Sequence, residues 1–314
     1  MRKKCVKRYL AIAIIMSAFL ISACTTTDQT GKVTAGKSPF IGGEKGIIAE
    51  FRDFGILEDA DIEEIFLSES FPIEVEVKNK GEFDVEAGGV NVTLSGINLA
   101  DFGGIPARSI LNSGEIERVS DLNLHGGEEI LDFTPTEDNA RYIPEILGNS
   151  VDITVVGNIV FHYKTFATVP KVCFKGDLKD KSFCEVEEVK TVFSSAAPIQ
   201  VKKVQERSSG IGLISLEFDV ENVGQGKVTK HRTPFDIRIP VLEFNITEKE
   251  KWDCTGRGKS GEVRLDDNGK GSIVCRLKES AKVAKEDLFT KEVALTLNYD
   301  YKDTIHKQLR INKE

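Results

Sequence analysis

The chain has 314 residues, and 40% of them are hydrophobic, which excludes a mainly disordered protein. The formal net charge is -8, and removal of residues 1–23, which carry five basic and no acidic residues, would leave -8 - 5 = -13. Phosphate backbones repel so acidic a protein, and we therefore expect no binding to nucleic acid.

The N-terminal segment that ends at Cys24 has the three parts of a secretory signal. Basic residues between Arg2 and Arg8 precede an apolar segment, Tyr9–Ile21, and small residues then lead to Cys24. Thirteen positions are too few to cross a bilayer, which takes about 20, so a cleaved signal is favoured over a retained anchor. The ending resembles the lipobox of prokaryotic lipoproteins. This resemblance implies a signal peptide over residues 1–23, a lipid on Cys24 and a location on the outer face of the cell membrane.

Two domains are expected after the signal. Residues 24–45 are rich in Thr, Gly, Lys and Ser, which is typical of a flexible tether. The remaining length favours two domains, placed at residues 46–192 and 193–314 and joined near Ser194–Pro198.

Apolar and polar residues alternate along several segments of both predicted domains. Residues 73–78 and 214–221 alternate strictly, and an Asn-x-Gly turn follows at Asn79 and at Asn222. A period of two predicts antiparallel strands with one buried face. Further strands are expected at 90–94, 153–163, 235–239 and 293–301, and short helical turns at 60–66 and 280–289.

Two landmarks recur at nearly the same spacing along the chain. Val77 and Val220, near the ends of alternating strands, are separated by almost as many positions as Tyr163 and Tyr301. Both tyrosines, and Tyr299, are expected to face inward. The repeated spacing favours a duplication, and short alternating strands with frequent turns predict an all-β protein of two tandem β-sandwich domains.

The strands that end in Asn-x-Gly resemble immunoglobulin-like modules of the CARDB type, which occur in prokaryotic surface proteins. Over most of residues 46–312 the chain is similar to uncharacterised exported archaeal proteins with two such modules. The resemblance is carried by Pro72–Gly81, Leu94–Gly96, Gly126–Gly127 before Phe133, Phe161–Cys173, Ala197–Gly224 and Cys254–Tyr301. It implies an immunoglobulin-like fold and an envelope setting, and it implies no activity.

The mature chain keeps four cysteines besides Cys24, namely Cys173, Cys184, Cys254 and Cys275. In an oxidising compartment they allow three pairings, of which the two local ones are the simplest. Each local disulfide would stabilise the fold by about 3 kcal/mol in the chain-entropy model. Four free thiols in a reducing cell are the alternative. A zinc site is disfavoured, because neither local pair has the usual C-x₂₋₄-C spacing. The loop 174–183 is expected beside the joint between the domains.

The sequence contains no recognisable catalytic motif. The four histidines, His125, His162, His231 and His306, are scattered singly, and neither a nucleophile elbow nor a phosphate-binding loop is present. We therefore expect no enzyme activity, no metal and no cofactor.

Two acidic clusters have alternative interpretations. Asp266, Asp267 and Asn268 before Gly269 can offer oxygen ligands to Ca²⁺, but a hairpin turn requires the same residue types and is favoured. Glu58–Asp61, together with Glu63 and Glu64, is interpreted as a solvated acidic loop, the alternative being a patch for calcium or a cationic partner.

Three further residues have candidate roles. Trp252, beside Cys254, is expected to pack against a disulfide rather than to form an exposed platform for sugars. Asn91 and Asn245 match the glycosylation acceptor pattern, and the sequence leaves their modification open.

These features predict a lipid-anchored protein of the cell envelope that is not an enzyme. It would contact the membrane through its N-terminal lipid and would bind an envelope protein or itself, as an accessory subunit of a surface assembly or as an adhesin. The alternative is an envelope receptor that binds a small ligand or ion for a transporter.

Overall fold

The computed structural model describes residues 37–59, 62–135, 139–179, 183–257 and 259–313, and residues 37–314 belong to one compact unit. The predicted signal peptide and Cys24 lie outside the described residues. Within the described part, no helix is long and apolar enough to cross a membrane. Short 3₁₀ turns occur at η1 (Leu99–Asp101), η2 (Lys249–Lys251) and η3 (Glu279–Ala281).

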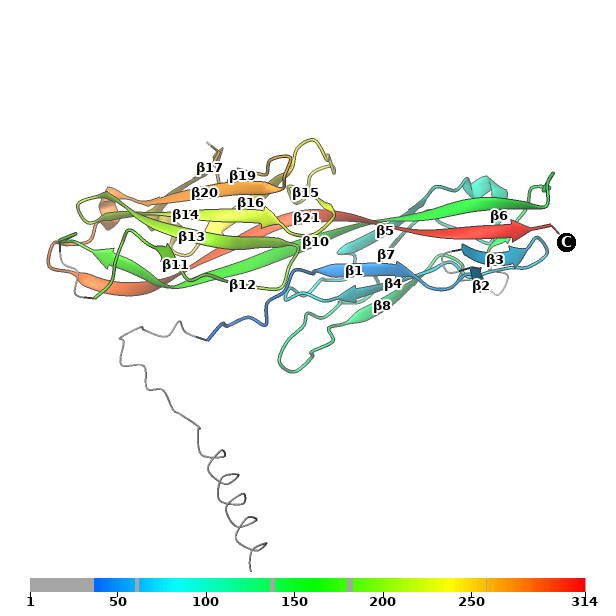
Figure 1. The fold of residues 1–314 in the computed structure, drawn as a ribbon, viewed down its shortest axis with the longest axis horizontal. Helices are drawn as coiled ribbons and strands as arrows, with labels where there is room; N and C mark the ends of the chain where they lie inside the picture. The colour runs from blue at the N-terminus through cyan, green and yellow to red at the C-terminus, as the bar shows by residue number, and fades with distance from the viewer. Residues whose placement is uncertain (1–36, 60–61, 136–138, 180–182, 258, 314) are drawn as a thin grey trace, which may run out of the picture. The chain divides into compact units, whose positions relative to one another are not determined.

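The described residues form an all-β fold (Figure 1). The largest sheet has the order β19 (Glu262–Arg264), β16 (Val241–Ile246), β21 (Leu288–Asn312), β10 (Ser150–Lys175), β5 (Val90–Ser95) and β7 (Ser109–Leu111). Four shorter strands join this sheet, namely β2 (Ile56–Asp59), β3 (Ile62–Phe66), β12 (Phe193–Ser194) and β15 (Lys227–Thr229). Apart from the parallel pair of β3 and β21, its strands pair antiparallel.

Three smaller sheets complete the fold. One has the order β11 (Val189–Lys190), β13 (Ile199–Gly210), β14 (Leu213–Asn222), β20 (Lys270–Leu277), β17 (Trp252–Gly256) and β18 (Lys259–Ser260). Another has the order β1 (Ile47–Phe51), β4 (Glu74–Asn79) and β8 (Glu128–Asp132). The last is the pair β6 (Phe102–Gly103) and β9 (Arg141–Tyr142).

Strands β10 and β21 form the centre of the fold. They pair antiparallel from Ser150 opposite Asn312 to Lys175 opposite Leu288, with one irregularity between Val169 and Val172. Figure 1 shows these two long strands running through both groups of shorter strands. The predicted strands 153–163 and 293–301 are thus confirmed, but each is only part of a longer strand.

The two long strands divide their length between two regions. We call β1–β9 with residues 150–163 and 302–312 the first region, and β11–β20 with residues 164–175 and 288–301 the second region. Each region thus includes a segment from the other half of the chain. The C-terminal strand, predicted to belong to the second domain, pairs with β3 of the first region.

Alternation along the strands produces the core. The inward apolar side chains Val75 and Val77 of β4 and Leu216 and Phe218 of β14 are fully buried, which confirms both predicted strands. Their polar neighbours are half-buried on the opposite face. Several antiparallel sheets with buried inner faces are consistent with a β-sandwich.

The repeated landmarks make the same contact in both regions. The Tyr163 hydroxyl donates to Oδ1 of Asn79, and the Tyr301 hydroxyl donates to Oδ1 of Asn222, each over 3.0 Å. Each asparagine also donates through its amide to the main-chain carbonyl of a residue shortly after it, Phe83 or Gly226, at 2.7 and 2.9 Å. We refer to these contacts as the two Asn–Tyr pairs. Tyr163 and Tyr301, as well as Tyr299, are buried, as predicted.

The predicted joint is a buried part of the fold. Ser195, Ala196 and Ala197 are at most 3% exposed. The side-chain amide of Gln200 donates to the carbonyls of Ser195 and Ala197 and to that of Gly43, at 2.8, 2.8 and 3.0 Å. The carbonyl of Gly43, predicted to be part of the flexible tether, also accepts the main-chain N–H of Ala197 at 3.4 Å and is therefore hydrogen-bonded to the joint.

Two local predictions are wrong. Residues 235–239 do not form a strand, because the carboxylate of Asp236 binds the main-chain N–H and the guanidinium of Arg238 and closes a turn. Local bonding of this kind competes with strand pairing. The predicted helical turn at 60–66 is also absent from its described part, since Ile62–Phe66 is strand β3.

Candidate functional site

Both local disulfides are present, and both lie in the second region. Cys173 is linked to Cys184, and Cys254 is linked to Cys275. Cys254 and Cys275 lie opposite each other on β17 and β20. Cys173 lies near the end of β10, opposite Thr290 of β21. The N–H of Gly176 donates to the carbonyl of Asp287 at 3.0 Å, whereas Ser194 of the joint pairs with Ala167, farther back along β10. The described start of the loop therefore does not lie beside the joint, and its predicted place there is wrong.

A buried ion pair supports the first of these disulfides. The Glu206 carboxylate is fully buried, accepts the main-chain N–H of Cys173 at 3.1 Å and pairs with the Lys190 ammonium at 2.9 Å. Burial raises the pKa of Glu206 to about 7, although Lys190 lowers it in part. This carboxylate therefore titrates near neutral pH while it holds the main chain of the disulfide loop.

The candidate calcium loop is a tight turn between β19 and β20, which lie in different sheets. Oδ1 of Asp266 accepts the main-chain N–H groups of Asn268 and Lys270, each at 2.9 Å, and Gly269 has a φ of +74°. These hydrogen bonds hold the pKa of Asp266 below its ordinary value. Among the described residues, no group of three or more His, Cys, Asp or Glu is arranged to hold a metal ion.

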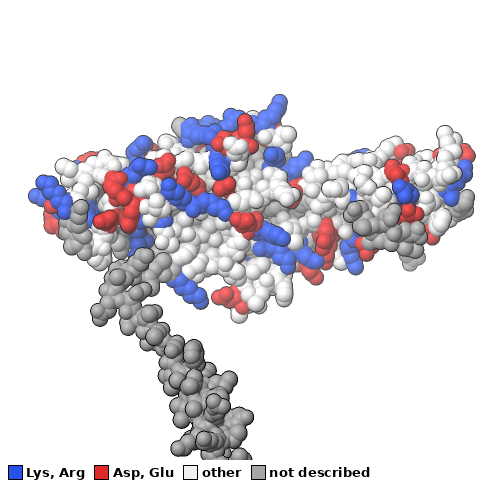
Figure 2. Space-filling view, viewed as in Figure 1, with Lys and Arg blue, Asp and Glu red and all other residues white. Residues whose placement is uncertain are grey.

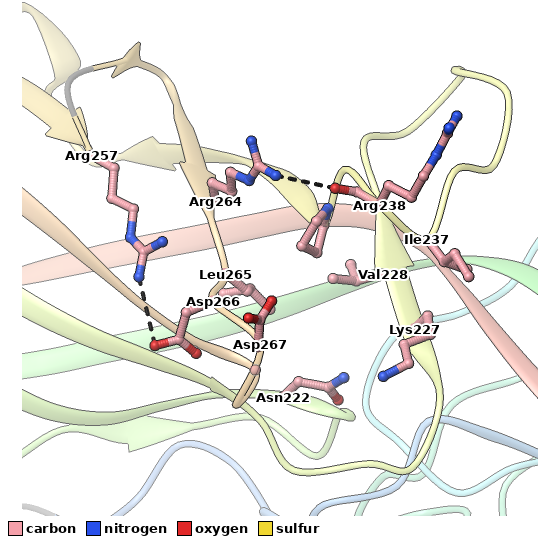
Figure 3. A pocket seen from close by; sticks show the side chains of 12 residues that line it. Asn222, Lys227, Val228, Ile237, Arg238, Arg257, Arg264, Leu265, Asp266 and Asp267 are labelled. Atoms are coloured by element: carbon pink, nitrogen blue, oxygen red, sulfur yellow. Dashed lines mark hydrogen bonds and ion pairs between the residues drawn. The ribbon is translucent and has the colours of Figure 1, made fainter.

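A polar pocket of about 670 Å³ lies beside this turn (Figure 3). Arg257 reaches Asp266 at 3.6 Å, and Arg264 donates to the main-chain carbonyl of Arg238 at 3.1 Å. In Figure 3 the Asp267 carboxylate points into the pocket between these groups. Figure 2 shows Lys and Arg gathered along the same edge of the molecule, with acidic side chains among them. The pocket therefore combines both signs of charge.

A larger groove, of about 1330 Å³, takes side chains from both regions. Its floor includes outward-facing residues of β10 and β21, and its walls include residues 83–89 and the segment at His231. The rings of His162 and His231 stack, with centroids 3.8 Å apart. His162 and Asp300 occupy opposite positions on the two long strands. Two histidines that are distant in the sequence thus form one cluster.

Hydrogen bonds fix this histidine cluster. His162 Nε2 lies 2.7 Å from Oδ1 of Asn298, and His231 Nδ1 lies 2.6 Å from Oδ1 of Asp300. Burial lowers the pKa of His162, and the neighbouring His231 lowers it further. The lowered pKa favours the neutral form of His162, and the groove offers ring nitrogens and carboxylates to a polar ligand. The positions of His162 and His231 in the sequence do not predict this cluster, because the pairing of distant strands places the two residues side by side.

Two other predicted sites have different outcomes. Trp252 is buried, with its ring 6.2 Å from that of Phe174, so it is not an exposed sugar platform. Asn245 is exposed, whereas Asn91 is half-buried and its amide oxygen accepts the hydroxyl of Ser109. Modification of either asparagine stays a prediction.

The predicted acidic loop includes Glu63 and Glu64, and these two residues lie in strand β3 instead of a solvated loop. Glu63 is 1% exposed, accepts the main-chain N–H of Gly55 at 3.0 Å and pairs with Lys307. Glu64 pairs with Arg310 at 3.3 Å. Both carboxylates therefore connect β3 to β21, a role that the sequence did not reveal because their partners lie near the other end of the chain.

Three exposed apolar side chains lie on segments near the end of β21. Phe66, Ile143 and Leu147 are 50%, 63% and 93% exposed. The main chain beside them is hydrogen-bonded, since the N–H of Leu67 donates to Asn312 at 3.0 Å, the N–H of Lys313 donates to Asn149 at 2.7 Å, and the N–H of Ile143 donates to Asp101 at 2.9 Å. We call Phe66, Ile143 and Leu147 the terminal apolar patch.

Comparison with protein-family models, with curated proteins and with solved structures finds no match to this chain. Function is therefore proposed from the geometry described above.

Proposed function

We propose that this protein is a lipid-anchored component of the cell envelope that makes non-catalytic contacts with another envelope protein. It has two immunoglobulin-like modules, is held on the outer face of the membrane by a lipid on Cys24, and acts as an accessory subunit of a surface assembly or as an adhesin. The two disulfides support this setting, because such bonds persist mainly in oxidising compartments.

The terminal apolar patch carries the proposal. Single exposed apolar residues are common, whereas a group of them on a fixed surface marks an interaction site. Apolar and aromatic side chains form the centre of protein interfaces. Phe66, Ile143 and Leu147 provide such a centre.

The fold holds this patch in a fixed position. Residues 309–312 of β21 pair with β10 on one side and with β3 on the other. A surface that is already ordered loses little conformational entropy when it binds a partner. Presentation of a rigid contact surface is therefore a function to which this architecture is suited.

The test is site-specific crosslinking in living cells. A photo-crosslinking side chain at Leu147 is compared with the same group at Ile211, which is 73% exposed in the second region. One envelope protein attached at Leu147 and not at Ile211, and lost when Cys24→Ala removes the anchor, is the expected result. Ile143→Ser should weaken that contact by about 1 to 3 kcal/mol. Equal labelling from both positions would contradict the proposal.

A second function, that of a receptor for a small ligand or ion, is favoured by the groove around His162 and His231. A cleft with convergent polar groups is the common form of a ligand site. A true ligand at 100 times its Kd would raise the free energy of unfolding by about 2.7 kcal/mol. Thermal shifts measured with small charged compounds, and lost in His231→Ala, would establish this alternative.

A further inference from the structure

A short loop of the first region presents two leucines to solvent. In the loop 120–126, Leu122 is 100% exposed and Leu124 is 68% exposed. When His125 is counted as neutral, Asp121 is the one charged residue of this loop. The loop therefore ends in an uncharged, apolar tip on a chain whose net charge is -8.

The loop cannot easily withdraw these side chains. Ser120 and Asn123 exchange main-chain hydrogen bonds of 2.9 and 3.1 Å, and Lys80 Nζ donates to the carbonyl of His125 at 2.8 Å. Gly126 has a φ of +70°, and a Cβ there would lie 1.9 Å from the carbonyl oxygen of Asn79. A conformation that requires glycine, closed by these hydrogen bonds, keeps both leucines exposed.

The loop lies beside the point where the described chain begins. Residues 118–121 and 37–41 line the same pocket, and Figure 1 shows the loop before β8 on the side where the described chain starts. The stretch from Cys24 to Lys37 can span at most about 45 Å, even if fully extended. A lipid on Cys24 would thus keep this side of the protein near the bilayer.

We propose that Leu122 and Leu124 insert into the surface of the membrane that holds the lipid on Cys24. The inference rests on the lipid anchor of the proposed function. One acyl chain binds a membrane weakly, and a second contact on the same molecule acts at high effective concentration. The leucines supply that second contact. They fix which side of the protein faces the lipid and leave the terminal apolar patch available to a protein partner.

The test uses the full lipidated protein on vesicles of zwitterionic phospholipid that contain a lipid-borne quencher. Leu124→Cys carries an environment-sensitive fluorophore, and Leu147→Cys, at a site that is 93% exposed, is the matched control. The four described cysteines are closed in disulfides and do not react with the label. The expected result is a blue shift and loss of emission at position 124, with neither at position 147. Adding Leu122→Ser should weaken the membrane contact roughly tenfold.

The outcomes separate the two proposals. Protein that does not float with the vesicles would refute the anchor and the loop contact together. Protein that floats while the label at position 124 stays unquenched would refute the loop contact alone. Disulfide-linked dimers of Leu124→Cys formed without vesicles would assign the leucines to a second copy of the chain and would also overturn the inference.

Discussion

The two regions share one buried contact, the Asn–Tyr pair, but differ in the other interactions that stabilise them. Both contain an Asn–Tyr pair with a hydrogen bond of 3.0 Å. The second region holds both disulfides, whereas the first region has none among its described residues. The first region instead receives the end of β21, whose Leu309 and Ile311 are fully buried. Two copies of one strand pattern can thus be stabilised either by covalent links or by a strand from the other half of the chain.

The largest effect is expected from Leu309→Ala. A leucine truncated in a packed core costs about 2 to 5 kcal/mol, so denaturant unfolding should show a loss of this size. Hydrogen exchange should be faster in β1 and β4 than in β14 and β20. Ile130→Ala, at an exposed site of the first region, is the control. Equal loss of protection in both regions would show that they unfold as one unit.

The reciprocal experiment removes a covalent link from the second region. Replacing both Cys254 and Cys275 by alanine should lower the free energy of unfolding by about 3 kcal/mol. Faster hydrogen exchange should be confined to β14, β17 and β20, because these strands contain the linked residues or pair with them. Faster exchange in β1 and β4 would mean that the disulfide supports both regions.

Matched glycine substitutions compare the two Asn–Tyr pairs directly. A Cβ on Gly81 would lie 2.0 Å from the Tyr163 hydroxyl and 2.6 and 2.7 Å from two main-chain carbonyls. A Cβ on Gly224 would lie 2.3 Å from the Tyr301 hydroxyl but no closer than 3.1 Å to Pro198. Overpacking costs about 1 to 3 kcal/mol, and we expect Gly81→Ala near the upper value and Gly224→Ala near the lower. A reversed order in thermal unfolding would contradict this ranking.

The last comparison concerns the pH dependence of the second region. Because the pKa of Glu206 is raised from 4.5 to about 7 in the folded protein, the folded state retains a proton that the unfolded state has lost. Stability should therefore fall as pH rises from about 4.5 to about 7, by at most about 3 kcal/mol. Glu206→Gln should remove this slope, while Lys190 keeps its contact with Glu188 at 2.5 Å. If stability depends on pH with the same slope in the wild type and in Glu206→Gln, the prediction is contradicted.

Local pattern predicted much of this fold. Alternation located β4, β5 and β14, and the inward register of Tyr163 and Tyr301 followed from it. Alternation failed at 235–239, where the short side chain of Asp236 forms a turn instead.

Long-range pairing could not be predicted from the sequence. His162 stacks on His231 because β10, β15 and β21 lie side by side. The ion pair of Glu63 with Lys307 likewise depends on the position of β21. No local composition specifies such partners, because single histidines and glutamates also occur in solvated loops. For the same reason the sequence did not indicate that a strand from the last residues completes the first region.

The pairing of β21 with β10 also determines when this protein can finish folding. Synthesis delivers the chain from its N-terminus, so residues 150–175 emerge well before residues 288–312, with which they form their longest ladder. During that interval the β21-facing edge of β10 lacks its partner, and unpaired edges promote association between chains. Contacts so distant in sequence also form slowly. The last strand to be synthesised thus decides whether the preceding ones reach their folded state.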